Sequence, residues 1–92
     1  MGEDRAIEGE PSPAYARRKA VLRNRELRLS LERAAARVLA NPNSLSRRWR
    51  RDDGVVVDGN EPGLLLAFEV ADASTVTWIE WHDLWARPEL VE

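Results

Sequence analysis

Two strand-length runs separated by a short polar break constrain the fold of this chain more than any other feature. The runs cover residues 64–70 and 76–81, and β-branched and aromatic residues dominate the second. The joining segment, residues 71–75, carries turn-forming residues. The sequence therefore predicts a β-hairpin with one strongly apolar face. Four alternating residues of the first run form that face: Leu64, Leu66, Phe68 and Val70.

Strict alternation also predicts the two faces of the second run. Ile79 and Trp81 are expected on one face, and Trp78, Glu80 and His82 on the other. Because each face then carries a tryptophan, neither face is simply solvated. Two readings of Trp78 follow: it packs under a tail or a helix, or it is exposed and forms a partner-binding patch.

The segment before the hairpin has the pattern of helices. Ser12 followed by Pro13 is a typical helix start, with the serine as N-cap and the proline at the first helical position. Residues 14–40 contain no glycine or proline, and apolar residues recur there at helical spacing. Asn24 interrupts the pattern as a second potential N-cap. We therefore expect two helices, at about 13–22 and 25–40, that form a hairpin; one long bent helix is the alternative.

Shorter elements complete the expected fold. Residues 1–10 are an acidic tail that adds an edge strand at 5–8, or no strand at all. The sheet is expected within residues 45–85, with an edge strand after Leu45 and a strand at 55–57. Because the helical stripes precede a run of strands, residues 1–92 are predicted to be a single α+β domain. Its architecture would be an N-terminal helical hairpin packed on a three- to four-stranded antiparallel sheet.

Charge is strongly segregated along the chain. Residues 11–52 hold twelve basic and three acidic residues, a net charge of +9, whereas residues 53–92 hold nine acidic residues and one arginine, a net charge of −8. The two parts either attract each other within the fold, or the basic part meets nucleic acid or an acidic partner. The chain has no cysteine, and its first residues lack the apolar core of a secretion signal. A cytoplasmic location is expected.

One short segment is the best candidate for a contact with a polyanion or another target. It has arginines on both sides of a tryptophan, which suits phosphate contact and base stacking. The other reading is a solvated edge strand whose charges prevent edge-to-edge pairing. The segment lies between a helix end and a turn, so its arginines are expected to reach solvent. Its residues are Arg47, Arg48, Trp49, Arg50 and Arg51.

Catalytic chemistry has little support in the sequence. His82 is the sole histidine, and a carboxylate-oriented general base would need Glu80, Asp83 or Glu69 beside it. A lone histidine at a strand end is more often structural or merely exposed. Metal binding would need more ligands, and no glycine-rich phosphate loop is present, so neither a metal nor another cofactor is expected. The sequence favours a protein that is not an enzyme.

Several short stretches are similar to the RelE/ParE toxins of toxin–antitoxin systems. They are Ser12–Ala14 opening the first helix, Leu31–Pro42 closing the second, Ala67–Val70 in a strand, and His82–Trp85 after the last strand. The order of expected elements is similar too, and the resemblance extends over nearly the whole chain. It implies a toxin module neutralised by a cognate antitoxin-like protein, whose contact segment lies in a groove on the sheet or along the helices.

The resemblance also implies which residues matter and where this chain departs from the family. The family's C-terminal aromatic corresponds by position to Trp85, which cannot act as an acid or base, and its nearby basic residue to His82 or Arg87. The central strands lack the basic residues that nucleolytic members use. A non-nucleolytic, ParE-like protein that binds a protein or nucleic-acid target is therefore expected. The alternative is a small, non-toxic interaction or regulatory module that uses a tryptophan-bearing face of the sheet.

Overall fold

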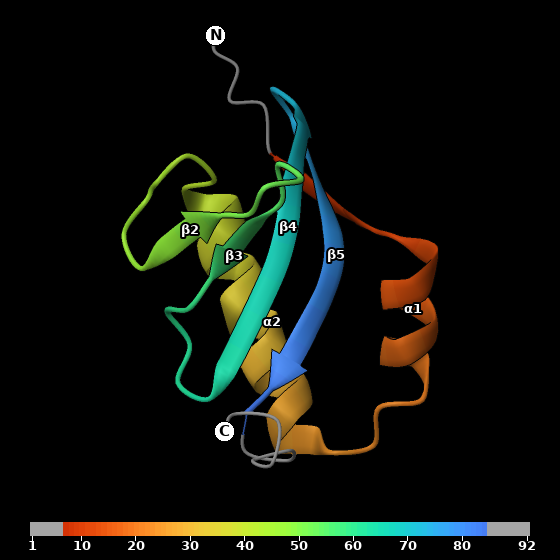
Figure 1. Ribbon diagram of the computed structural model, residues 1–92. Helices are drawn as coiled ribbons and strands as arrows, with labels where there is room; N and C mark the ends of the chain where they lie inside the picture. Colours follow the sequence, from red (N-terminus) through yellow and green to blue (C-terminus); the bar gives the residue numbers. More distant parts are fainter. Residues whose placement is uncertain (1–6, 85–92) are drawn as a thin grey trace, which may run out of the picture.

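The computed structural model describes residues 7–84 as two helices and a five-stranded sheet (Figure 1). Its α+β class agrees with the sequence. The elements, in chain order, are β1 (Glu8–Pro11), α1 (Pro13–Ala20), α2 (Arg25–Ala40), β2 (Arg48–Arg50), β3 (Val56–Asp58), β4 (Leu64–Asp72) and β5 (Thr75–Asp83). Neither helix in this part of the chain is long and apolar enough to cross a membrane.

The sheet is mixed, whereas the sequence predicted three or four antiparallel strands. Its order is β1-β5-β4-β3-β2, and β1 pairs in parallel with β5 while all other pairs are antiparallel. The N-terminal strand lies at residues 8–11, whereas the sequence predicted 5–8; residues 5 and 6 of that range lie outside the described residues. Hydrogen bonds at both its ends fix it there, since the Glu8 N–H donates to the Ser74 carbonyl and the Ser12 N–H to the Trp78 carbonyl, each at 2.9 Å.

The two separate helices are confirmed, and each begins at a side-chain cap. Ser12 Oγ accepts the Tyr15 N–H at 3.2 Å, and Asn24 Oδ1 accepts the Leu27 N–H at 3.0 Å. The first helix ends at Ala20, two residues before the predicted 22. Capping at Asn24 breaks the chain into two helices, which excludes one long bent helix.

The predicted helical hairpin is only partly correct, because the helices pack on the sheet more than on each other. α1 stands beside β5, whereas α2 crosses the sheet against β4 (Figure 1). Tyr15 is the sole buried residue of α1, and Leu31, Ala34 and Val38 are the buried residues of α2. With so few large apolar residues on α1, the two helices contact the same core and leave a groove between them.

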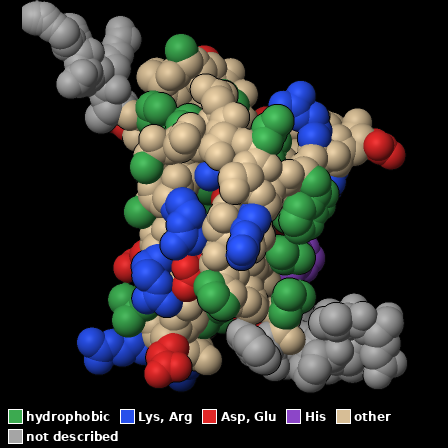
Figure 2. Space-filling model, turned by 90° about the vertical axis from the view of Figure 1, so that its left-hand side faces the viewer, with side chains coloured by type: hydrophobic (Ala, Val, Ile, Leu, Met, Phe, Trp, Pro, Cys, Tyr) green, Lys and Arg blue, Asp and Glu red, His purple; other side chains and the backbone are tan. Residues whose placement is uncertain are grey.

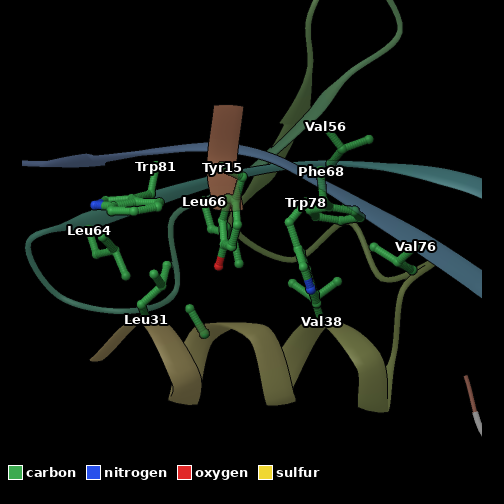
Figure 3. Close-up of a cluster of buried hydrophobic side chains, with 11 residues drawn as sticks. Tyr15, Leu31, Val38, Val56, Leu64, Leu66, Phe68, Val76, Trp78 and Trp81 are labelled. Carbon is green, nitrogen blue, oxygen red and sulfur yellow. The ribbon is translucent and has the colours of Figure 1, made fainter. Parts of the chain in front are cut away.

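A β-bulge in β5 decides which side chains enter the main core. Ala67 lies opposite Glu80, but Phe68 lies opposite Trp78, so Ile79 is an extra residue in β5. The bulge turns Trp78 and Trp81 to the same face, the one that the helices cover (Figure 3). The prediction that these tryptophans point to opposite faces is therefore wrong, because strict alternation assumes an unbroken ladder.

The predicted hairpin of residues 64–70 and 76–81 is confirmed as β4 and β5. Leu64, Leu66 and Phe68 enter the main core, where Leu31 and Val38 reach up from α2 to meet them (Figure 3). The alternation fails at its last member: Val70 is 42% exposed. It lies near the hairpin tip, which extends beyond the helices (Figure 1).

Candidate functional site

The predicted Arg–Trp segment forms the edge of the sheet. β2 is confined to three residues, shorter than the edge strand expected after Leu45. Along it, Arg48 faces the helices and Trp49 faces the opposite side, because side chains alternate across a strand. Figure 2 views this edge and shows several Lys and Arg side chains there, some with acidic side chains beside them.

Arg48 is a structural residue. The sequence predicted that its side chain would reach solvent, but the structure buries it. Its Nε donates to Asp58 Oδ2 at 2.6 Å, and the two side chains are 2% and 0% exposed. Its Nη1 donates to the carbonyl oxygens of Asn41 and Ser44, at 2.7 and 2.9 Å. One guanidinium therefore joins the end of α2 to β3. A buried charge needs hydrogen-bonding partners around it. Because Arg48 is held by these partners, it is not available to a ligand.

Trp49 lies on the other side of the sheet and is 49% exposed. It stands opposite Val57 in the ladder and over Gly59, where an added Cβ would come within 3.4 Å of its ring. A small apolar cluster continues across this side. We call the residues involved the second face; they are Trp49, Val55, Val57, Leu65, Ala67 and Ile79.

A line of charged side chains lies beside the second face and runs from the residue after β2 to β5. Arg51 Nη2 lies 2.7 Å from Asp53 Oδ2, and its Nη1 lies 3.2 Å from Glu80 Oε2. His82 Nε2 is 3.4 Å from the same oxygen of Glu80. The Val55 N–H and the Arg51 guanidinium hold the pKa of Asp53 below its usual range. The structure thus brings Arg51 and His82, thirty-one positions apart in the sequence, to one carboxylate.

The remaining predicted residues are divided between this site and other places. Arg47 and Arg50 are exposed and form no ion pair with another residue in the range 7–84. Arg47 has a φ of 56°, a left-handed conformation that is uncommon for a residue with a side chain. Trp85 and Arg87 lie outside the described residues.

The arrangement on the second face suits binding better than acid–base chemistry. The side chains of His82 and Glu80 are 56% and 42% exposed, and the carboxylate is shared with Arg51. General-base catalysis gains from a water-excluded pocket in which the base is held in one orientation. Residues 7–84 contain no group of three or more His, Asp or Glu side chains placed to hold a metal ion.

A second candidate site is the groove between α1 and α2; the resemblance implied a groove on the sheet or along the helices, but of the residues that line this one the sequence singled out only Trp78 as a candidate contact. It has a volume of about 820 Å³, within the usual range of ligand sites, roughly 300–1,000 Å³. The available signal was the spacing of Ala16 and Ala20, which puts two small side chains on one face of α1.

Comparison of the chain with protein-family models, with curated proteins and with solved structures gave no match.

Proposed function

We propose that the chain is a RelE/ParE-like toxin module of a toxin–antitoxin pair, acting in the cytoplasm by binding a protein target without cleaving RNA. The observation that carries this proposal is the second face, where a half-exposed Trp49 lies opposite Val57, a member of an apolar cluster. The order of the elements supports the proposed RelE/ParE likeness, because an N-terminal strand is followed by two helices and then by a run of strands. The antitoxin-like partner is the protein that would keep such a module inactive.

A protein target is favoured over a nucleic acid by the charges around Trp49. Of the four arginines in residues 47–51, Arg48 is buried and Arg51 is paired with two carboxylates. Glu80 and Asp53 lie beside Arg51, and they would repel a phosphate backbone. Protein–protein contacts usually have an apolar centre that is rich in aromatic residues and a polar rim. A tryptophan with apolar neighbours and with paired charges around it fits that composition.

Induced expression in a bacterial host tests the proposal. Growth arrest is expected with the wild-type chain, with relief by co-expression of the reading frame beside its gene. Trp49→Ala should abolish the arrest. The matched control is Leu45→Ala, which truncates another exposed apolar side chain, 71% exposed and outside the second face.

Two results would contradict parts of the proposal. Arrest by Trp49→Ala as strong as by the wild type would exclude the second face as the target contact. No arrest by a well-expressed wild-type chain would favour the non-toxic interaction module, which the same half-exposed tryptophan would serve. Salt-dependent binding of RNA or duplex DNA, lost on changing Arg47 and Arg50 to Ala, would indicate a nucleic-acid target. The slope of log affinity against log salt would then fall by at most about 1.8 for duplex DNA.

A further inference from the structure

Two polar atoms of buried aromatic side chains lie in the groove between α1 and α2. They are the hydroxyl of Tyr15 and the indole Nε1 of Trp78, on residues that are 3% and 6% exposed and that both line the groove. Figure 3 shows the two atoms turned from the sheet towards α2. Neither has a hydrogen-bond partner within residues 7–84. In this part of the chain no fully enclosed side-chain nitrogen or oxygen lacks a partner, so both atoms open on to the groove.

The chemistry of these two atoms indicates what the groove would accept. An indole N–H only donates hydrogen bonds, and a phenol hydroxyl donates one. A donor taken out of bulk water without a partner costs free energy, and native proteins usually pair such a group with protein, water or a ligand. Tyr15 and Trp78 therefore favour an occupant that brings hydrogen-bond acceptors to the floor of the groove.

The walls of the groove are apolar and small. Ala16 and Ala20 line it from α1, and Ala35, Ala36 and Leu39 line it from α2. Three of the four alanines are exposed, so no side chain of the walls fills the space. The volume of about 820 Å³ is that of a site for a small molecule. An apolar body of one or two rings, or a short acyl chain, would bury its surface there.

The charges at the groove favour an anion over a cation. Lys19 lies one turn after Tyr15 on the same side of α1, is half-buried, and forms no ion pair with another residue in the range 7–84. Arg28 lines the groove from α2 and donates to the Leu22 carbonyl. Glu32 is the sole acidic residue among those that line the groove. Two positive charges against one negative charge attract a ligand with a single negative charge.

From these observations we propose that the groove binds a small apolar carboxylate, a molecule with one carboxylate on an aromatic or short acyl body. The carboxylate accepts hydrogen bonds from the Tyr15 hydroxyl and the Trp78 indole N–H, and Lys19 supplies the opposite charge. The apolar body lies between the alanines of α1 and α2. The groove is on the helix side of the sheet, away from the second face, so this inference goes beyond the proposed function and does not depend on it.

The test titrates the full chain with probes that differ in one feature at a time. Naphthylacetate carries the carboxylate, naphthylacetamide is its neutral counterpart, and naphthylethylamine is a cation with the same ring. Decanoate replaces the ring with an acyl chain and so distinguishes the two kinds of body. By calorimetry, naphthylacetate or decanoate is expected to bind, with naphthylacetamide about fivefold to tenfold weaker than naphthylacetate. Naphthylethylamine is expected not to bind.

The indole N–H signals of the protein report the contact directly. The chain has four tryptophans, and hydrogen bonding to the carboxylate should shift the indole N–H signal of Trp78. The signal of Trp49, on the second face, is the internal control and should stay in place.

Variants at the polar end of the site test each partner of the carboxylate. Tyr15→Phe keeps the ring, removes one donor and should weaken the carboxylate by about tenfold or more. Lys19→Gln should weaken it by about twofold to fivefold, whereas Arg17→Gln, on α1 outside the groove, should leave the affinity within about twofold. Glu32→Gln removes a like charge and should strengthen binding by about twofold. Thermal unfolding confirms that each variant is folded at the temperature of the titration.

A pair of variants at the apolar walls tests the space itself. Ala36→Trp should fill the groove and weaken the carboxylate by about tenfold or more. Its control is Ala14→Trp, at an exposed position of α1 away from the groove, and should bind as the wild type does.

Several results would overturn the proposal. They are no binding of either carboxylate at millimolar concentration, equal binding of naphthylacetate and naphthylacetamide, an unchanged Trp78 signal on binding, and equal effects of the groove variants and their controls. Concentration-dependent dimerisation abolished by Ala36→Trp would also overturn it, because the occupant would then be a second copy of the chain. Growth arrest, or its absence, bears on the proposed toxin function and leaves these measurements unaffected.

Discussion

The guanidinium of Arg48 and the carboxylate of Asp58 form a buried ion pair, 2.6 Å from nitrogen to oxygen, between directly opposed residues of β2 and β3. This pair also holds the end of α2, through the two carbonyl oxygens that Arg48 contacts. Asn60 adds a hydrogen bond from its side chain to Asp58 at 3.0 Å. Arg48, which belongs to a strongly basic segment, therefore links three elements of the fold: α2, β2 and β3.

Removal of one member of this pair should destabilise the protein strongly. Asp58→Ala leaves a buried guanidinium without its carboxylate and should lower the free energy of unfolding by about 3–5 kcal/mol. The double variant Arg48→Met with Asp58→Leu should recover most of that loss. Urea denaturation measures both. Arg50→Ala, in the same strand but exposed, is the control and should change stability by no more than about 0.5 kcal/mol.

Gly9 is required by the packing of Trp78 on β1. A Cβ at position 9 would lie 2.4 Å from the indole Nε1 of Trp78, so the ring or the strand must move. Gly9→Ala should therefore lower the free energy of unfolding by about 1–3 kcal/mol. In the control Gly59→Ala, the nearest atom to the new Cβ is 3.4 Å away, and a change below about 1 kcal/mol is expected. Equal losses in thermal or urea unfolding would contradict the Trp78 contact.

The buried side chain of Tyr15 should lower the free energy of unfolding in alkaline solution. Burial, and after it the negative charge of Glu32, raises the pKa of Tyr15 from 10.0 to about 12. Between these values the unfolded chain loses the phenol proton and the folded chain retains it. This contribution is complete below pH 10 and is lost as the pH rises towards 12.

The chain has a single tyrosine, so its ionisation can be followed directly. Absorbance near the phenolate band should show a midpoint close to pH 12 in the folded protein, and urea unfolding between pH 9 and 12 should show the falling stability. Tyr15→Phe removes this part of the pH dependence. A midpoint near 10 with the fold intact would contradict the buried phenol.

Arg47 adopts its left-handed conformation at the start of β2. Glycine accepts this conformation readily and valine does not, so Arg47→Gly should be more stable than Arg47→Val by about 1–2 kcal/mol. At Arg50, inside the strand, the order should reverse, because valine favours strands and glycine weakens them. Urea denaturation of the four variants measures these differences in stability. The same order at both positions would contradict the left-handed conformation of Arg47.

The elements with strong local patterns were predictable from the sequence, and those set by distant contacts were not. The caps at Ser12 and Asn24 and the alternation from Leu64 to Phe68 are local signals, and the structure has these elements. The bulge at Ile79 has no comparable signal, since one extra residue in a ladder depends on the partner strand. It alone determines that Trp78 and Trp81 share a face.

The candidate site shows the same division. Alternation along an edge strand separates Arg48 from Trp49, but only the fold supplies Asp58 as the buried partner of the arginine. The sequence suggested Glu80 as one of three carboxylates that could lie beside His82, but the approach of Arg51 to the same carboxylate depends on the register of the strands between them and was not predicted. The groove between α1 and α2 depends on how far apart the helices stand, which no spacing within either helix determines.

The parallel pairing of β1 with β5 has a consequence for how this protein acquires its fold during synthesis. The first strand finds its partner only after β5 has been made, because Glu8 is matched with Thr75 and Pro11 with Trp78. Contacts of such long sequence separation slow folding. A chain interrupted before β5 would lack the strand that joins β1 to the rest of the sheet, along with both tryptophans beneath the helices. Folding of this domain is therefore expected to be a late, all-or-none event that waits for its last described strand.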